Sequence, residues 1–253
     1  MKNPENRFKA ALKAGRHQLG IWNSIGGNTV PEMLAGCGFD WVLVDTEHSP
    51  VDVNDVLPAL QAIAAYPETS ALVRPAFNDP VLIKRILDHG AQTLLLPYIQ
   101  SVEEAEAAVR AVRYPPAGIR GVAGLTRASR YGAVDRYTET ASDEICLLLQ
   151  VETAHAMKSL KAIASVDGVD GIFIGPSDLA ASMGHPGNPG HPEVVAAIEA
   201  AVATLTAMGK PAGILTLDEN FARRCIELGT LFTAVSVDLA VLVKGVRDLR
   251  ARF

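Results

Sequence analysis

The chain has 253 residues, of which 49% are hydrophobic and 20% charged, and its formal net charge is -5. This length and composition support a large buried core, and we expect residues 1–253 to form a single catalytic domain. The slight acidic excess excludes the concentrated basic surface that nucleic acid or anionic lipid requires, so the expected partners are small molecules.

The N-terminal segment 1–20 mixes charged residues with alanines, which is typical of a surface helix and not of a signal peptide. No later run approaches the roughly 18 apolar residues that cross a membrane. The three cysteines, Cys37, Cys146 and Cys225, are far apart and form no CxxC pair. A reducing cytoplasm is therefore the expected location.

Short runs rich in Val, Ile and Leu alternate with segments of helical period along the rest of the chain. The predicted strands are residues 18–24, 39–48, 69–77, 91–99, 144–153, 169–178, 211–217 and 232–238. The helical segments include residues 51–66, 79–90, 102–113, 191–209 and 218–229, each with one apolar stripe.

Most of these strands are continuously apolar. This is typical of parallel strands that are buried on both faces, with helices covering one of them. Eight successive strand-helix units predict an α/β fold, a single (β/α)8 TIM barrel with an additional N-terminal helix. An open doubly wound sheet is the alternative. It usually carries a GxGxxG turn after its first strand, and IWNSIGGNTV lacks that spacing.

Catalytic groups of such barrels lie at the C-terminal ends of the strands, and those ends are unusually polar here. They carry Trp22, Asn23, Asp45, Glu47, His48, Arg74, Gln150, Glu152, Ser177, Asp178 and Asp238. Asp and Ser at such positions often cap the next helix, but Arg, His and Glu are poor caps. The set indicates a site for an anionic, oxygen-rich ligand.

Glu152 and Asp178 end neighbouring strands and offer two carboxylates to one cation. With no adjacent Cys or His to select zinc, the pair favours a hard divalent ion such as Mg²⁺ or Mn²⁺, with Co²⁺ as a further candidate. An open coordination sphere would accept a 2-oxo acid, and the ion would then act as a Lewis acid. The alternative for Asp178 is a helix cap.

Two further rim residues suit enolate chemistry. Arg74 would stabilise the developing oxyanion, the alternative being a salt bridge in the barrel mouth. His48 is the only histidine at a strand end and could exchange a proton near neutral pH, especially beside Asp45. A lysine Schiff base needs a lysine at a strand end, and the sequence has none there.

The segments VDTEHSP, VRP, LLLQVET and GIFIGPSDL, in that order, together with RGVAGLTRASRYG, resemble the class II pyruvate aldolases. This family includes the 4-hydroxy-2-oxoheptanedioate and 2-dehydro-3-deoxyglucarate aldolases, and the resemblance runs from about Gly20 to the last helix. It implies an aldehyde-lyase that reversibly cleaves 4-hydroxy-2-oxo acids to pyruvate and an aldehyde, with oxaloacetate decarboxylation as a side activity.

The resemblance also implies roles for individual residues. Glu152 and Asp178 would hold the metal, His48 would be the acid-base group, and Arg74 would bind the keto oxygen. The expected substrate-binding residues are Trp22, Gln150, Gly175, Pro176, Ser177 and Leu215. The position of Ser177 is often alanine in relatives, so its hydroxyl either contacts the substrate carboxylate or caps the helix.

The resemblance further implies a hexamer built as a trimer of dimers, with the last helix packed on, and swapped with, a neighbouring subunit. Asp88 would support the histidine of the adjacent subunit. The loop that carries Arg120, Arg127 and Arg130 would either serve a neighbour's site or solvate a surface. His185 and His191 have no ligand partner at helical spacing and are expected to be structural.

Two other functions remain open on the sequence. A metal-dependent lyase of the phosphoenolpyruvate or coenzyme A type would need a phosphate site, and LTLDEN and VSVDLA show no glycine-rich turn. A non-catalytic 2-oxo acid binding protein would have no need of His48.

Overall fold

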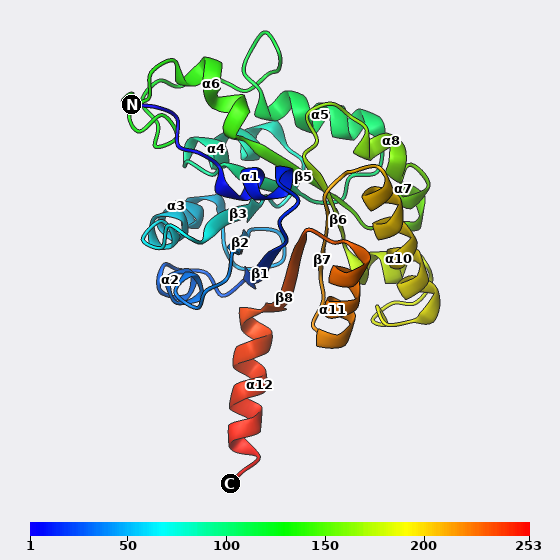
Figure 1. Cartoon of the computed structure of the whole chain (residues 1–253). Coiled ribbons are helices and arrows are strands. Elements are labelled where there is room, and N and C mark those ends of the chain that lie inside the picture. The colour runs from blue at the N-terminus through cyan, green and yellow to red at the C-terminus, as the bar shows by residue number, and fades with distance from the viewer.

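A computed structural model describes residues 1–253 and confirms the predicted (β/α)8 barrel. Eight parallel strands close in sequence order, with helices around them (Figure 1). The strands are β1 Gln18–Asn23, β2 Trp41–Asp45, β3 Ser70–Arg74, β4 Thr93–Leu96, β5 Cys146–Val151, β6 Gly171–Ile174, β7 Ala212–Leu215 and β8 Phe232–Val237. Each lies inside its predicted range and is shorter, so several predicted strand-end residues begin the loops that follow.

Twelve helices accompany the strands. They are α1 Arg7–Lys13, α2 Thr29–Ala35, α3 Val53–Ile63, α4 Pro80–Asp88, α5 Val102–Val112, α6 Tyr137–Glu144, α7 Ala154–Lys158, α8 Leu160–Ala164, α9 Pro176–Ser182, α10 Pro192–Ala207, α11 Glu219–Leu228 and α12 Asp238–Arg250. Several begin at an aspartate whose side chain accepts backbone N–H groups, as at Asp52 and Asp79. No helix is both long and apolar enough to cross a membrane.

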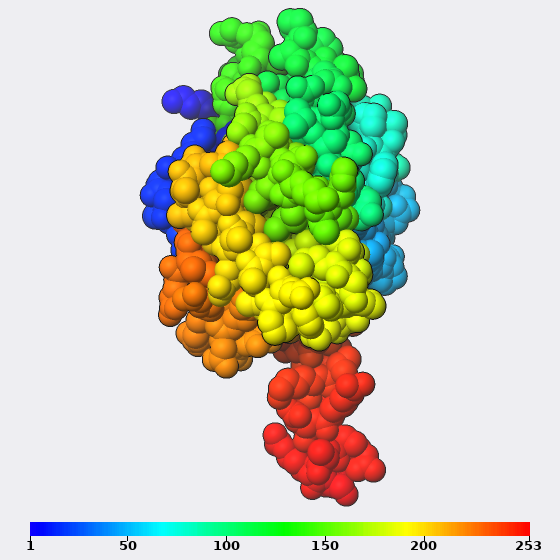
Figure 2. All heavy atoms as spheres, turned by 90° about the vertical axis from the view of Figure 1, so that its right-hand side faces the viewer, coloured from blue at the N-terminus to red at the C-terminus, as the bar shows by residue number.

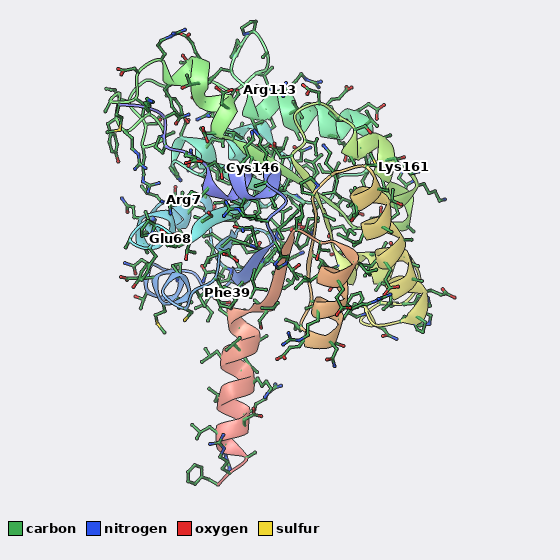
Figure 3. All side chains as sticks on the ribbon, in the orientation of Figure 1. Arg7, Phe39, Glu68, Arg113, Cys146 and Lys161 are labelled. Carbon is green, nitrogen blue, oxygen red and sulfur yellow. The ribbon has the colours of Figure 1, made fainter.

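Two apolar cores position the active face. A cluster of 46 buried residues lies between the strands and the surrounding helices, and a second cluster of 12 includes Trp41, Leu148 and Phe232. Phe8 of α1 packs edge-on against Trp41 and Phe232, which begin β2 and β8, so α1 closes the N-terminal end of the barrel. Cys146 lies in this second cluster and is fully buried (Figure 3).

The large rings inside the barrel depend on glycines in neighbouring strands. A Cβ at Gly20 would lie 2.0 Å from the Trp41 ring, and one at Gly213 would lie 2.1 Å from the Phe232 ring. Only a residue without a side chain fits at either position. With this end filled by aromatic rings and α1, the opposite end is left to the functional residues.

The last helix, α12, leaves the C-terminal end of β8 and projects away from the barrel (Figures 1 and 2). Its first residue, Asp238, is buried and accepts hydrogen bonds from Asn23 Nδ2 (2.8 Å), Ser24 N (3.0 Å) and Ile25 N (3.1 Å). The predicted rim residues Asp238 and Asn23 are therefore structural, because they tie the end of β1 to the start of α12.

Candidate active site

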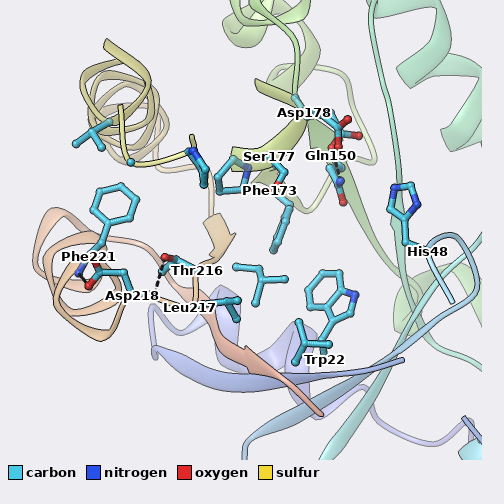
Figure 4. Close-up of a pocket in the computed structure, with 18 of the residues that line it drawn as sticks. Trp22, His48, Gln150, Phe173, Ser177, Asp178, Thr216, Leu217, Asp218 and Phe221 are labelled. Carbon is cyan, nitrogen blue, oxygen red and sulfur yellow. Dashed lines mark hydrogen bonds between the residues drawn. The ribbon is translucent and has the colours of Figure 1, made fainter. Parts of the chain in front are cut away.

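One cavity of about 650 Å³ opens at the C-terminal ends of the strands. All predicted site residues line it except Asp45 and Asp88. Gln150 and Asp178 lie toward one end with His48 near them, while Asp218 and Phe221 lie toward the other (Figure 4). The sequence therefore predicted the carboxylate-bearing end of the cavity well.

Arg74 lines the cavity and is held in a fixed position by its neighbours. The register of β2 and β3 pairs Asp45 with Arg74, and both side chains are buried. Arg74 Nε and Nη2 donate to the two Asp45 oxygens at 2.8 and 2.6 Å, and Nη1 lies 2.8 Å from Glu47 Oε2. The guanidinium also stacks 5.1 Å from the Trp22 ring centre. This bidentate pairing preorganises a cation at the cavity.

Asp45 was predicted to stand beside His48, and the structure places it on Arg74 instead. Burial opposes ionisation of Asp45, but the hydrogen bonds and the charge of Arg74, together with the backbone N–H of Glu47, outweigh it and hold the pKa of this carboxyl below its usual value. Asp45 is therefore a partner that orients Arg74. The salt bridge predicted as the alternative for Arg74 is present, and it leaves the guanidinium at the cavity.

Glu152 is 2% exposed and is oriented by hydrogen bonds from two neighbours. Gln150 Nε2 donates to its Oε2 at 2.5 Å, and the backbone N–H of Tyr98 donates to its Oε1 at 2.9 Å. Tyr98 has a positive φ of 55°, an uncommon conformation for a residue with a side chain. A Cβ at Gly175 would lie 2.3 Å from Glu152 Oε2, so glycine is required beside this carboxylate.

The second predicted metal ligand, Asp178, lies in the first turn of α9. The helix is preceded by Gly175 and has no side-chain cap, so neither Asp178 nor Ser177 caps it. The carboxylate of Asp178 makes no hydrogen bond or ion pair within the chain, which leaves its oxygens available for a cation. The capping alternative for Asp178 is wrong.

Three carboxylates repel one another at this end of the cavity. Burial raises the pKa of Glu152 to about 7, and Asp178 and Glu47 add to the rise. Burial also raises the pKa of Glu47 to about 7, with Arg74 opposing and Asp45 and Asp178 contributing. A divalent cation would relieve this repulsion, and the hard oxygen donors of Glu152 and Asp178 fit Mg²⁺ or Mn²⁺. Glu47 was predicted to lie at this rim, but the sequence assigned it no role.

His48 lies in the turn after β2 and lines the cavity, with 69% of its side chain exposed. Its Nε2 is 4.0 Å from Glu47 Oε2, which is too long for a hydrogen bond. The imidazole is accessible to solvent and to a substrate in the cavity. Within one chain, no carboxylate fixes its orientation.

Asp88, at the end of α4, is remote from this cavity and pairs with Arg120, whose Nη2 donates to Asp88 Oδ1 at 2.9 Å. The Arg120 side chain is fully buried and lies over the rings of Tyr114 and Tyr137. Of the two alternatives given for this loop, the solvation of a surface does not hold for Arg120, because this side chain fastens the loop to its own barrel. Arg127 Nη1 likewise donates to His89 O at 2.9 Å, whereas Arg130 is exposed.

No lysine lines the cavity, which agrees with the absence of a Schiff-base lysine at the strand ends. The lysine nearest a strand in sequence, Lys210 before β7, donates to Val169 O at 2.5 Å. Burial lowers the pKa of Lys210. Both residues precede their strands, so this lysine lies at the end of the barrel opposite the cavity.

His185 and His191 stack at 3.5 Å between ring centres, and His185 Nε2 lies 3.0 Å from Glu193 Oε2. His191 Nδ1 accepts from Glu193 N and caps α10. Both histidines thus contact Glu193, His185 through the carboxylate and His191 through the backbone N–H, a partner that the helical spacing did not reveal. Their contacts close the loop from 183 to 191, and Pro189 and Gly190 of that loop line the cavity.

Comparison with known proteins agrees with this geometry. The HpcH/HpaI aldolase/citrate lyase family matches residues 18–245. A Rhizobium etli protein named pyruvate aldolase is 63% identical over 253 residues, 100% of this chain and 99% of that protein. A hydroxypyruvate/pyruvate aldolase of Sagittula stellata is 57% identical over 253 residues, 100% of each chain.

More distant matches span equally complete lengths. A 4-hydroxy-2-oxo-heptane-1,7-dioate aldolase of Escherichia coli is 55% identical over 250 residues, 98% of this chain and 95% of that protein. The crystal structure of an HpcH/HpaI aldolase/citrate lyase family protein from Burkholderia cenocepacia superposes with a TM-score of 0.94 at 38% identity and covers 98% of each chain. The chain therefore belongs to the HpcH/HpaI aldolase/citrate lyase family.

Proposed function

We propose that this enzyme is a divalent-metal-dependent aldolase that reversibly cleaves 4-hydroxy-2-oxo acids to pyruvate and an aldehyde. Membership of an aldolase family and the names of the relatives at 55–63% identity support the reaction class. The observation that carries the proposal is local. Two carboxylates, Glu152 and Asp178, line the cavity beside one fixed cation, Arg74, and Glu47 is ion-paired with that arginine.

Glu152 and Asp178 would hold the metal ion, which when bound supplies a Lewis acid to the keto oxygen of the substrate. Arg74 donates to that same oxygen as negative charge develops on it during carbon-carbon cleavage. The N–H groups of Ser177 and Asp178, free of intrahelical bonds in the first turn of α9, donate to the substrate carboxylate.

His48 moves the proton. In the cleavage direction it accepts the proton of the 4-hydroxyl group, and in the synthetic direction the same group removes a proton from the pyruvate methyl carbon. Because His48 is exposed in the turn after β2, its imidazole is accessible to both the hydroxyl group and the methyl carbon of a bound substrate. We propose that Asp88 of an adjacent subunit orients this imidazole, since Asp88 of the same chain lies elsewhere, against Arg120.

Two further properties follow from the same chemistry. Oxaloacetate decarboxylation is a proposed side activity, because it also places negative charge on the keto oxygen at Arg74. Either Mg²⁺ or Mn²⁺, with Co²⁺ as a further candidate, suits the two carboxylates. The small-molecule substrates are pyruvate, the 2-oxo acid and an aldehyde.

An assay of 4-hydroxy-2-oxopentanoate cleavage, in which the released pyruvate is measured, tests the proposal. We expect release with Mn²⁺ or Mg²⁺, little release after chelation, and a loss of at least about 100-fold in kcat/KM for Glu152→Gln. Asp167→Asn removes an exposed carboxylate outside the cavity and serves as the matched control. A metal-loaded wild-type protein that releases no pyruvate would contradict the proposal and favour a binding protein.

A further inference from the structure

The end of the cavity opposite the metal-binding carboxylates is formed by the segment that joins β7 to α11. Leu215, Thr216, Leu217 and Asp218 line this end, and Phe221 of α11 faces the same space (Figure 4). If the reacting carbons lie at Arg74, as the proposed function requires, the remainder of the aldehyde extends toward this segment. The residues here therefore decide which aldehydes the enzyme accepts.

Charge is distributed very unevenly along the cavity. Arg74 is the only arginine or lysine among the lining residues, and Asp45 and Glu47 already neutralise it. At the far end the only charged lining residue is Asp218, which is exposed. A carboxylate at the distal end of an aldehyde would meet a like charge there, and no cation of this chain would pair with it.

The backbone at this end does not favour an anion either. The N-terminus of α11 would ordinarily attract one, but Asp218 Oδ1 accepts from Asn220 N (2.8 Å) and Phe221 N (3.1 Å). The cap therefore occupies the donors that a substrate carboxylate would use. Thr216 Oγ1 accepts from Asp218 N at 3.2 Å, and its hydroxyl proton remains free to donate to an uncharged polar group.

We propose that this end of the cavity is an acceptor subsite for uncharged aldehydes, with Asp218 as the residue that discriminates against aldehydes bearing a carboxylate. Leu215, Leu217 and Phe221 contact the hydrocarbon part of the acceptor. Thr216 and the second oxygen of Asp218 serve hydroxyl groups on it. The inference rests on the proposed function and specifies its aldehyde class.

A pair of aldehydes that differ only in charge provides the test. Consumption of 4-oxobutanoate and of its methyl ester is measured with pyruvate and Mn²⁺, and kcat/KM is compared. We expect the wild type to prefer the ester. Asp218→Asn, which keeps a side-chain oxygen to cap α11, should raise kcat/KM for 4-oxobutanoate by about two- to fivefold, as expected for one exposed charge, and change that for the ester less.

Glu219→Gln is the matched control, because it removes the neighbouring charge in the first turn of α11 at a residue outside the cavity. It should leave both values unchanged. The inference is overturned if the wild type prefers 4-oxobutanoate, if Asp218→Asn leaves the ratio unaltered, or if Glu219→Gln shifts it equally. Failure of the proposed function gives a different result, since neither aldehyde would then be consumed with pyruvate.

Discussion

At the scale of single residues, the proposed reaction depends on the position of Arg74. Its guanidinium is fixed by two hydrogen bonds that it donates to Asp45 and by one ion pair with Glu47, so it needs no reorganisation when charge develops on a substrate oxygen. Arg74→Ala should lower kcat/KM for aldol cleavage by about 10²- to 10³-fold. Arg74→Lys retains the charge without the bidentate geometry and should retain part of the activity. A folded Arg74→Ala variant that cleaves at the wild-type rate would exclude this role.

The carboxylates around Arg74 make stability depend on pH and metal. The pKa values of Glu47 and Glu152 are raised from 4.5 to about 7 in the fold, so folding favours their protonated forms. In metal-free protein, this contribution to the free energy of unfolding is present below about pH 4.5 and is lost as pH rises to about 7. A cation favours the ionised forms, so the increase in Tm on adding Mn²⁺ should be larger at pH 7.5 than at pH 5.5. Thermal melts with chelator and with Mn²⁺ measure this, and equal increases at both pH values, or an undiminished increase in Glu152→Gln, would contradict it.

The sequence was sufficient to predict which residues line the carboxylate-bearing end of the cavity, but not which neighbours each of them contacts. A polar residue at the end of an apolar run is visible in the sequence, and so Glu152, Asp178, Arg74 and His48 were found. The pairing of Asp45 with Arg74 depends on the register of β2 and β3, which no local pattern encodes. Thr216 and Asp218 were missed because they follow the short strand β7 in a turn, where polar residues are ordinarily caps, and Phe221 because it lies in helix α11.

At the scale of elements, the barrel interior depends on close contact between strands and aromatic rings. Gly20→Ala would place a methyl group within 2.0 Å of the Trp41 ring, which is fully buried and cannot move aside. The substitution should lower the free energy of unfolding by about 1–3 kcal/mol. Urea denaturation measures it, with Gly124→Ala as the control, since a Cβ there meets nothing within 4 Å. A Gly20→Ala variant as stable as the control would show that the barrel repacks freely.

Strand order and number were predictable because eight continuously apolar runs separated by amphipathic helices fit few folds. Their exact ends were not, since the sequence does not show where the ladder hydrogen bonds stop and the following turn begins. Segment 39–48 illustrates this: β2 ends at Asp45, and Glu47 and His48 occupy the turn that follows. The turn lets Glu47 point toward Arg74 while His48 faces the cavity.

At the scale of the whole molecule, α12 carries an exposed row of apolar residues that no other part of the chain covers. Leu239, Leu242, Val246 and Leu249 recur at helical spacing and are all exposed. We propose that this row packs on a neighbouring subunit, as the expected swapped hexamer requires. Leu242→Glu should therefore reduce the molar mass measured by light scattering, while Lys244→Glu, on the opposite side of α12, should not. A monomeric wild type would contradict the proposal.

The measurement that tests the central claim most directly is deuterium exchange at the pyruvate methyl group, followed by NMR with no aldehyde present. The protein is first stripped of metal and then supplied with Mn²⁺ or Mg²⁺. The account predicts negligible exchange without metal and rapid exchange after its addition, because removal of the methyl proton requires Arg74, His48 and a cation held by Glu152 and Asp178 together. Absence of exchange in both states, or exchange at equal rates in both, would contradict a metal-dependent pyruvate aldolase.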